Sequence, residues 1–364
     1  MNLQESFAAW RAHAPKHAEM GVILPDVIGY STEEIKRDYT IAMDAQPSLV
    51  TTANSAIPAM LTTFIDPEII NIAFAPLEAA NILSEQKKGD WTTDTAMFPV
   101  VGHEGEVNSY GDYNETGSIG INMNWPQRQS YHWQTMVRYG EREVERAGLA
   151  RVNFVGLLQK ASADILNRYG NFVYFYGVGG LQNYGLLNDP ALPASLTPGT
   201  KAAGGGNVWI TSAGAVNATA NEVYADIQAM FWQLATQNMG LVKENDQMVL
   251  AMSPGSSVAL TITNSYGVDV RALLKQNFPN IRVVTAQQYA TKSANNPEGN
   301  AGGNFVQLIA ETIDGDKAGS VAFTEKLRAH RLVTETSSWK QKHSSGSWGA
   351  IIKKPLGFSS MLGV

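Results

Sequence analysis

The clearest candidate for metal chemistry is the stretch DGDKAGSVAFTE, residues 314–325. Four of its residues stand at positions 1, 3, 6 and 12 of a calcium-binding loop: Asp314, Asp316, Gly319 and Glu325. Position 5 is an alanine, however, and a strand-like pattern precedes the stretch where the calcium motif requires a helix. The same residues suit a polar hairpin turn between two strands. We favour the hairpin turn and expect no metal site here.

Two other spacings resemble parts of active sites. His13 and His17 stand four residues apart, as two metal ligands on one helical face would, but no HExxH motif accompanies them. Ser337 and Lys340 form an SxxK spacing without a partner motif of the SDN or KTG kind. We interpret the histidines as part of a solvated helix and the SxxK spacing as a chance match.

Glycine clusters in GVGGLQNYG, residues 177–185, and AAGGGNVW, residues 202–209, complete neither a GxGxxG motif nor a phosphate-binding loop. They predict turns or hinges instead. Because no catalytic motif is complete, we expect no enzyme and no cofactor. A metal- or nucleotide-dependent enzyme is the remote alternative, and a stoichiometric ligand in the purified protein would distinguish it.

The composition indicates extended segments and contacts between proteins. Only 16% of the 364 residues are charged, against roughly 25% in an average domain. The chain contains 33 glycines and 15 prolines, which favour turns and loops, and no cysteine, which excludes disulfides. The N-terminus does not resemble a secretory signal, and no apolar run approaches the length of a membrane span.

Charge is distributed unevenly along the chain. Residues 85–118 carry seven acids against two lysines, a net charge of -5, whereas residues 326–364 carry seven Lys and Arg against Glu335, a net charge of +6. These segments are able to attract each other, although two solvated surfaces of opposite sign would give the same pattern.

The first part of the chain predicts an arm, a helix and a ribbon. Residues 1–65 show little that would form an independent core. Asp66 and the proline after it suit the N-cap and first position of a helix over 66–84. Residues 91–102 and 118–137 then suit two strands around a polar tip, because apolar residues alternate with Gly and Asn from Ile119 to Trp125.

Helical and strand patterns alternate in the remainder. Periodic apolar residues predict a long helix over 137–170, followed by a loop-rich stretch over 171–206. From residue 207 onward helix and strand patterns alternate, among them a helix over 220–237 and strands over 247–254 and 305–313, which indicates an α+β or α/β order. Pro355 lies in the apolar C-terminal stretch and suits an edge strand that returns to an earlier sheet.

The predicted ribbon needs a partner surface. A two-stranded hairpin is only marginally stable alone in water. The ribbon region also carries many aromatic residues, a type enriched at protein interfaces: Trp91, Tyr110, Tyr113, Trp125, Tyr131 and Trp133. We expect the ribbon to lie on another surface, which need not belong to the same chain.

Three motifs follow one another along the chain: YGDYNETG, RQSYHWQTMVRYGEREVERA and FYGVGGLQNYGLLNDPALP. With these motifs the chain, from about residue 60 to the C-terminus, resembles a family of tailed-bacteriophage major capsid proteins. The resemblance implies an α+β capsid fold shared with encapsulins. Its parts would be an N-terminal arm (1–65), a peripheral domain (66–84 and 131–206) with a spine helix (137–170), an extended loop (85–130), an axial domain (207–335) and a C-terminal strand (336–364) returning to the peripheral domain.

The resemblance also implies a structural function. The chain would self-assemble as hexamers and pentamers into an icosahedral head enclosing double-stranded DNA, bound without sequence specificity. A separate scaffolding protein, a portal and decoration proteins are implied partners, without a membrane. The location would be the virion, with assembly in the host bacterial cytoplasm. An encapsulin-like cargo shell is the alternative, and neighbouring genes would distinguish the two.

On this interpretation the extended loop crosses a neighbouring subunit. The candidate interface residues are Trp91, Tyr110, Asp112, Tyr113, Glu115, Trp125, Arg128, Lys353 and Lys354. The acids of the loop tip are expected to meet the lysines of a neighbour's C-terminal segment.

Overall fold

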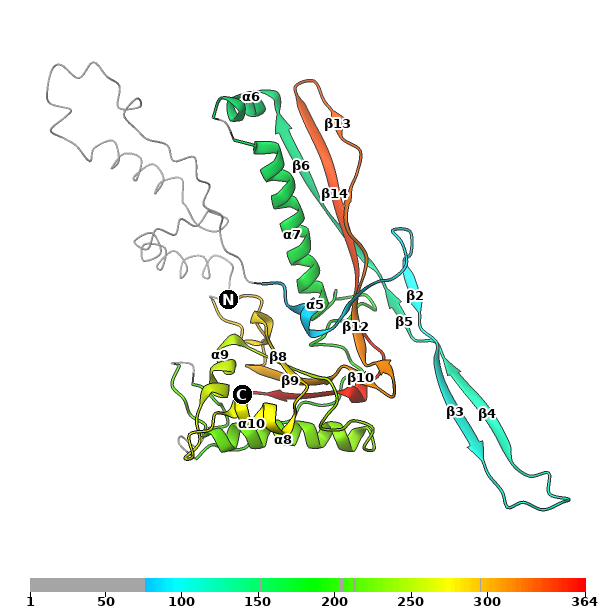
Figure 1. The fold of residues 1–364 in the computed structure, drawn as a ribbon. Helices are drawn as coiled ribbons and strands as arrows, with labels where there is room; N and C mark the ends of the chain where they lie inside the picture. Colours follow the sequence, from blue (N-terminus) through cyan, green and yellow to red (C-terminus); the bar gives the residue numbers. More distant parts are fainter. Residues whose placement is uncertain (1–75, 151, 203–205, 212–213, 295) are drawn as a thin grey trace, which may run out of the picture. The chain divides into compact units, whose positions relative to one another are not determined.

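The computed structural model describes residues 76–150, 152–202, 206–211, 214–294 and 296–364 (Figure 1). The chain divides into one unit of Met1–Ala75 with Ser293–Pro297 and a second of Pro76–Lys292 with Glu298–Val364. In the described residues of the first unit, Ser293 and Asn296 exchange backbone hydrogen bonds of 3.1 Å. The predicted arm, the helix start at Asp66 and the pair His13 and His17 lie outside the described residues. The elements below belong to the second unit.

A four-stranded sheet forms the centre of the main core. Its strands are β7 (Met248–Met252), β8 (Ile281–Thr285), β9 (Phe305–Ala310) and β15 (Phe358–Leu362), in the order β15-β9-β7-β8. β7 runs parallel to β8, and β9 runs antiparallel to both β7 and β15. Every residue of β7 and β9 is buried, which explains why β7 is a continuous apolar run and β9 is apolar except for Gln307.

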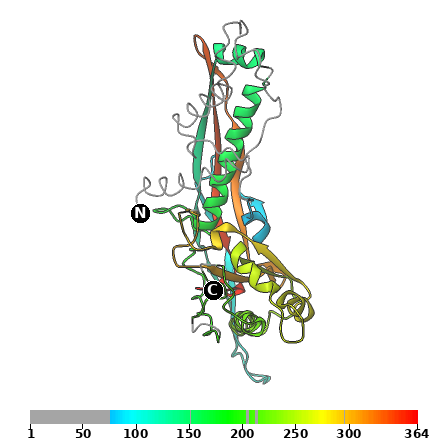
Figure 2. The same cartoon turned by 90° about the vertical axis from the view of Figure 1, so that its left-hand side faces the viewer.

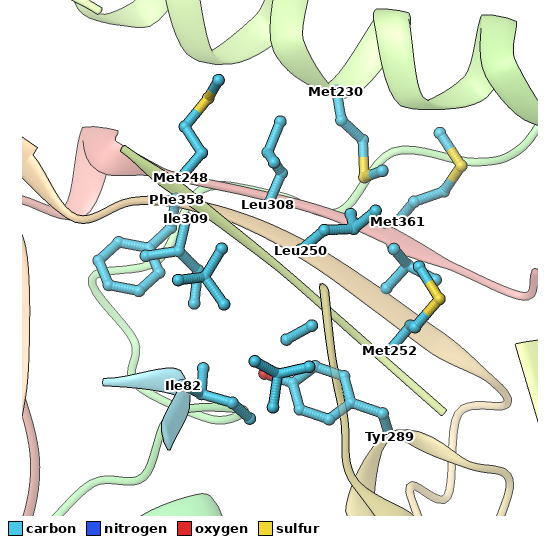
Figure 3. Close-up of a cluster of buried hydrophobic side chains, with 14 of the residues drawn as sticks. Ile82, Met230, Met248, Leu250, Met252, Tyr289, Leu308, Ile309, Phe358 and Met361 are labelled. Carbon is cyan, nitrogen blue, oxygen red and sulfur yellow. The ribbon is translucent and has the colours of Figure 1, made fainter. Parts of the chain in front are cut away.

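Helix α8 (Ala220–Gln237) covers one face of this sheet. Its start is a capping box, in which the Thr219 hydroxyl accepts from the Glu222 amide and the Glu222 carboxylate accepts from the Thr219 amide. Met230 points from α8 toward the sheet, where Leu308 and Met361 share the facing side (Figure 3). The shorter elements α9 (Pro254–Ser257), η3 (Val258–Thr261) and α10 (Val270–Asn277) follow β7.

The opposite face of the sheet packs against other parts of the chain. Tyr289 of η4 (Gln287–Tyr289) donates a hydrogen bond to Gln307 of β9 at 2.8 Å and meets the Phe175 ring edge-on. Ile82 of α5 (Ala79–Ile82) is buried in the same cluster (Figure 3). The four-stranded sheet is therefore covered on both faces within its own chain.

A second, five-stranded sheet lies beside a long helix. Its strands are β1 (Glu85–Lys87), β6 (Tyr131–Gly140), β12 (Gly319–Ala329), β13 (Val333–Thr334) and β14 (Ser338–Ile352). β14 pairs with β6 over ten residues and with β12 on its other side. Helix α7 (Phe154–Tyr176) runs alongside β6 and β14 in both views (Figures 1 and 2). A hydrogen bond of 2.8 Å between Ser162 and Nδ1 of His343 fixes α7 to β14.

The prediction of one helix over 137–170 is wrong in its bounds. Residues up to Gly140 belong to β6, because their backbone groups pair with β14, about 200 residues further along the chain. The helical residues then divide into α6 (Glu141–Leu149) and α7, which starts at the N-cap Asn153 and continues to Tyr176. The Asn153 side chain accepts from the Gly156 amide and so favours a new helix start there.

The C-terminal residues also differ from the expectation of a single returning edge strand. β14 lies between β6 and β12, so it is an interior strand of the five-stranded sheet. The chain turns at η5 (Pro355–Gly357), and β15 then pairs with β9 at the edge of the other sheet. β12, placed in the predicted axial segment 207–335, likewise belongs to the five-stranded sheet.

The calcium-like stretch begins with a tight turn. β10 (Thr312–Ile313) and β11 (Asp316–Lys317) pair antiparallel, and Asp314 and Gly315 between them have φ of 51° and 78°. The interpretation as a polar hairpin turn is confirmed. Among the described residues no group of three or more His, Asp or Glu side chains is placed to hold a metal ion. None of the described helices is long and apolar enough to cross a membrane.

Candidate subunit interface

The predicted ribbon is formed by β3 (Val100–Glu106) and β4 (Ser118–Asn124), which pair antiparallel along their full length (Figure 1). Side chains at directly opposed positions lie on the same face. One face, the apolar ribbon face, therefore consists of three opposed pairs: Val101 with Met123, His103 with Ile121 and Gly105 with Ile119. The other face is mainly polar and carries Glu104, Glu106, Ser118, Asn122 and Asn124.

All residues of β3 and β4 are exposed in the described structure. Ile119 is 90% exposed and Ile121 is 66% exposed. Fully burying one such side chain stabilises an assembly by roughly 1.5–3 kcal/mol. A row of apolar side chains on one face only is the pattern of a strand that has one covered face. Among the described residues, no other element covers this apolar surface of the ribbon.

The ribbon tip presents four of the predicted interface residues to solvent: Tyr110, Asp112, Tyr113 and Glu115. The Tyr110 hydroxyl donates a hydrogen bond of 3.0 Å to Asp112, whereas Tyr113 is fully exposed. The Asn114 side chain donates to the carbonyl of Ser109 at 2.8 Å, which holds the turn closed. The tip is an exposed acidic and aromatic loop.

The ribbon base is anchored within its own chain. β2 (Thr95–Met97) pairs with β5 (Gln127–Gln129), and the Arg128 guanidinium forms an ion pair of 2.8 Å with the buried Asp189. The same guanidinium lies 4.9 Å from the centre of the Tyr184 ring. Arg128, predicted at the subunit interface, therefore fixes the loop to its own subunit.

Trp91 also contacts its own chain. Its ring meets His132 edge-on at 4.7 Å, and Arg328 lies 5.3 Å from the ring centre. Trp125, which follows β4, is half exposed. Of the two predicted tryptophans, Trp125 is thus the more exposed.

The two predicted lysines have different surroundings. Lys354 forms an ion pair of 3.3 Å with Asp316 of its own chain. Lys353 is exposed. Burial lowers the pKa of Lys88, and the charge of Lys353 lowers it further, so Lys353 lies near a cation. Within the described part of the chain no ion pair joins either lysine to the acids of the tip.

Two features of this region were not predicted from the sequence. The alternation in β4 was visible, but the residues of β3 that complete the apolar ribbon face, such as Val101 and His103, depend on the strand register. The pairing of Arg128 with Asp189 joins residues 61 positions apart and had no local signal.

Comparison with known proteins identifies the family. The profile of the Pa193 gp26 major capsid protein family matches residues 48–363. The chain belongs to the Pa193 gp26 major capsid protein family. The predicted membership of a phage major capsid family is confirmed, and the chain is a structural subunit of an icosahedral phage capsid.

Solved capsids share the fold of this capsid subunit. The capsid of the myovirus phage XM1 has a TM-score of 0.67 at 17% identity and covers 85% of this chain and 100% of its own. The capsid of a native GTA particle has a TM-score of 0.57 at 13% identity and covers 86% of this chain and 99% of its own. A structure of Gordonia phage Cozz has a TM-score of 0.53 at 10% identity and covers 85% of this chain and 92% of its own. No curated protein sequence matches the chain. The expected capsid fold of tailed phages is confirmed.

Proposed function

We propose that this capsid subunit stabilises the shell by laying its β3–β4 ribbon across a neighbouring subunit. The observation that carries the proposal is the apolar ribbon face, which is exposed in the chain although its alternating pattern is that of a half-buried strand. A ribbon of two strands gains stability mainly from a surface that covers this face. The subunit's role is structural and requires no catalysis.

The two sheets suggest how the subunit is divided. We assign the five-stranded sheet with α7 to the peripheral domain, and the four-stranded sheet with α8 and α10 to the axial domain. The candidate interface retains the exposed residues Tyr110, Asp112, Tyr113, Glu115 and Trp125, together with Lys353. Lys354 and Arg128 both form ion pairs within their own chain.

Membership of a capsid protein family suggests further binding partners for the chain. Hexamers and pentamers of the chain would build the shell, with a separate scaffolding protein, a portal and decoration proteins during assembly in the host cytoplasm. The packaged partner would be double-stranded DNA. Because the chain carries a net charge of -6, we expect weak, salt-dependent binding of DNA without sequence preference. A strong preference for one DNA sequence in a binding assay would contradict this expectation.

Deletion of the ribbon tests the proposal. Residues 99–125 are replaced by Asn-Gly, which joins the two ends of the β2–β5 ladder through a short turn. The amide of Phe98 already donates to the carbonyl of Pro126 at 3.1 Å, so the ends are close. We expect a folded subunit that forms no regular shells by electron microscopy. Shells of wild-type size from this variant would refute the role of the ribbon.

A further inference from the structure

Strand β6 forms an edge of the five-stranded sheet, because among the described strands only β14 pairs with it. Just beyond the two strands, the Glu141 amide donates to the carbonyl of the opposed Ser337 at 3.0 Å. Hydrogen-bonded pairs alternate along an antiparallel ladder, so the odd-numbered residues of β6 bond to β14. The carbonyl of Lys342, opposite Met136, accordingly accepts from the His330 amide on the other side of β14. The even-numbered residues of β6 therefore direct their amides and carbonyls away from β14.

This edge of β6 has no hydrogen-bond partner within the described part of the chain. Four residues carry the outward backbone groups: His132, Gln134, Met136 and Arg138. The last three are exposed. β6 contains no proline and only one charged side chain, so it lacks the features that usually keep an edge strand from pairing. Such an edge is able to bind another strand through its backbone.

A second copy of β6 matches this edge in length. β6 has ten residues, whereas the other described strands with a wholly unpaired edge have at most seven, as in β3 and β4. Two β6 strands that run antiparallel about a two-fold axis at Thr135 would place each edge residue opposite a residue of the other copy. The two edges would then satisfy each other along their whole length.

The side chains of β6 are compatible with this pairing. On one face Trp133 would lie opposite Val137 of the second copy, and Thr135 opposite its own equivalent. Aromatic residues paired with β-branched ones, and Thr paired with Thr, stabilise antiparallel strands. On the other face Gln134 would meet Met136 of the second copy. In this register no two Lys or Arg side chains stand directly opposite each other.

The long helices leave room for the pairing. Ser162 of α7 bonds to His343, which places this part of α7 over β14. Between the two β14 strands of the pair would lie both β6 strands, so three strand spacings separate them, about 14 Å in all. Two packed helices need only about 8–10 Å between their axes.

We infer that β6 of one subunit pairs antiparallel with β6 of a second copy across a two-fold axis and joins two five-stranded sheets into one. An icosahedral shell contains two-fold axes, and such an axis brings the same surface of two copies together. The inference concerns a different surface from the ribbon and does not depend on the ribbon's proposed function.

Thr135→Cys tests the pairing directly, because the chain contains no cysteine. In the inferred pair, residue 135 occupies a position without hydrogen bonds between the copies, where opposed Cα atoms lie about 4.5 Å apart. This distance suits a disulfide. After mild oxidation of assembled shells, we expect most subunits to run as disulfide-linked dimers on a non-reducing denaturing gel.

Gln134→Cys is the matched control. Its two copies would stand diagonally, with Cα atoms about 7–8 Å apart, which is too far for a disulfide. We expect a dimer yield at least about tenfold lower than that of Thr135→Cys. Shells mixed from Gln134→Cys and Met136→Cys chains should form dimers again, because these positions are opposed in the inferred register.

Three results would overturn the inference. They are intact shells of Thr135→Cys without dimers, equal dimer yields from Gln134→Cys alone, and a disulfide from Thr135→Cys to another protein of the particle. The last result would show that a different strand occupies the edge.

A second measurement removes one edge amide and leaves the ladder between β6 and β14 intact. Gln134→Pro deletes an amide that points away from β14, a position where edge strands tolerate proline. Each pair of subunits would lose two hydrogen bonds, so the subunit concentration needed for assembly should rise at least about tenfold. The unfolding midpoint should stay close to that of the wild type. Gln134→Ala keeps the amide and should assemble normally, whereas normal assembly of Gln134→Pro would overturn the inference.

Discussion

Strands β9 and β4 differ in how their apolar side chains are shielded from water. Both present apolar side chains, but all six residues of β9 are buried, whereas all seven residues of β4 are exposed. β9 lies between β7 and β15, and its sequence FVQLIA is apolar except for Gln307. β4 pairs only with β3 and alternates, SIGINMN. β9 is thus stabilised by contacts within its own chain, whereas β4 is left uncovered by the described residues, as its proposed role in contacting another subunit requires.

The largest expected loss of subunit stability is at a buried ion pair beside the four-stranded sheet. Asp226 of α8 pairs with Lys201 and accepts a hydrogen bond of 2.6 Å from the Trp209 indole. Asp226→Ala leaves the buried Lys201 ammonium without this partner. We expect the free energy of unfolding to fall by about 3–5 kcal/mol in urea unfolding.

The control for this variant is Asp112→Ala at the exposed tip of the ribbon. It should change the unfolding free energy by less than about 0.5 kcal/mol. If both aspartate variants unfolded alike, the contrast between the buried core around the four-stranded sheet and the exposed ribbon would be refuted.

Replacing one isoleucine in each strand compares the contributions of β9 and β4 to subunit stability most directly. Ile309 of β9 is fully buried, and Ile121 of β4 is exposed. Ile309→Ala should cost about 2–5 kcal/mol of unfolding free energy, because it removes contacts and leaves a cavity. Ile121→Ala should change subunit stability by less than about 0.5 kcal/mol.

In shell assembly, Ile121→Ala should have the larger effect of the two variants. At temperatures where both subunits stay folded, light scattering should show slower or weaker shell formation for Ile121→Ala than for Ile309→Ala. A ribbon variant that lowered the unfolding midpoint as much as the core variant would show that β4 is covered within its own subunit.

Elements with local signals were predictable from the sequence. Helix α8 agrees with the predicted segment 220–237 because apolar periodicity and the Thr219 capping box act in the same place. Strands β7 and β9 were recognisable as short apolar runs. In each case the local preference and the tertiary contacts favour the same structure.

Elements decided by distant partners were not predictable in detail. The predicted strand ended at residue 137, where the predicted helix began, but pairing with β14 continues strand β6 to Gly140. For the candidate interface, the alternation in β4 indicated a ribbon, but only the register assigns Val101 and His103 to its apolar face. The same limit explains Arg128, whose partner Asp189 is distant in sequence.

A smaller effect is expected from pH. Burial lowers the pKa of His343, and the charge of His330 lowers it further, so the folded state favours the neutral ring. Below the ordinary histidine value of about 6.5 the unfolded chain binds a proton that the folded chain binds less readily. Stability should therefore fall as the pH is lowered from about 7.5 toward the depressed pKa of the folded state.

The measurement is the urea midpoint against pH for the wild type and His343→Gln. The variant should show a weaker dependence on pH in this window, and a parallel dependence would exclude His343 as the group responsible. Ile121→Ala should retain the full wild-type dependence, because β4 does not contact the Ser162 and His343 pair.

The smallest effect on the subunit is expected at the exposed lysines. Replacing both Lys353 and Lys354 by Glu removes the partly exposed ion pair with Asp316, and such a pair contributes about 0–1 kcal/mol. A glutamate at 353 would also attract Lys88 instead of repelling it, so the two changes partly offset each other within the subunit.

The effect of the double variant on assembly should be larger than its effect on subunit stability, because a shell repeats each contact at every equivalent interface. If Lys353 meets the acidic tip of a neighbour, the double variant should assemble less well than the wild type at low salt, and salt should weaken the wild type because it screens exposed charges. Asp112→Lys with Glu115→Lys should then partly restore assembly of the double variant. Light scattering across a salt series measures all three proteins. Unchanged assembly of the double variant at low salt would mean that the ribbon is held by its apolar face without help from these charges.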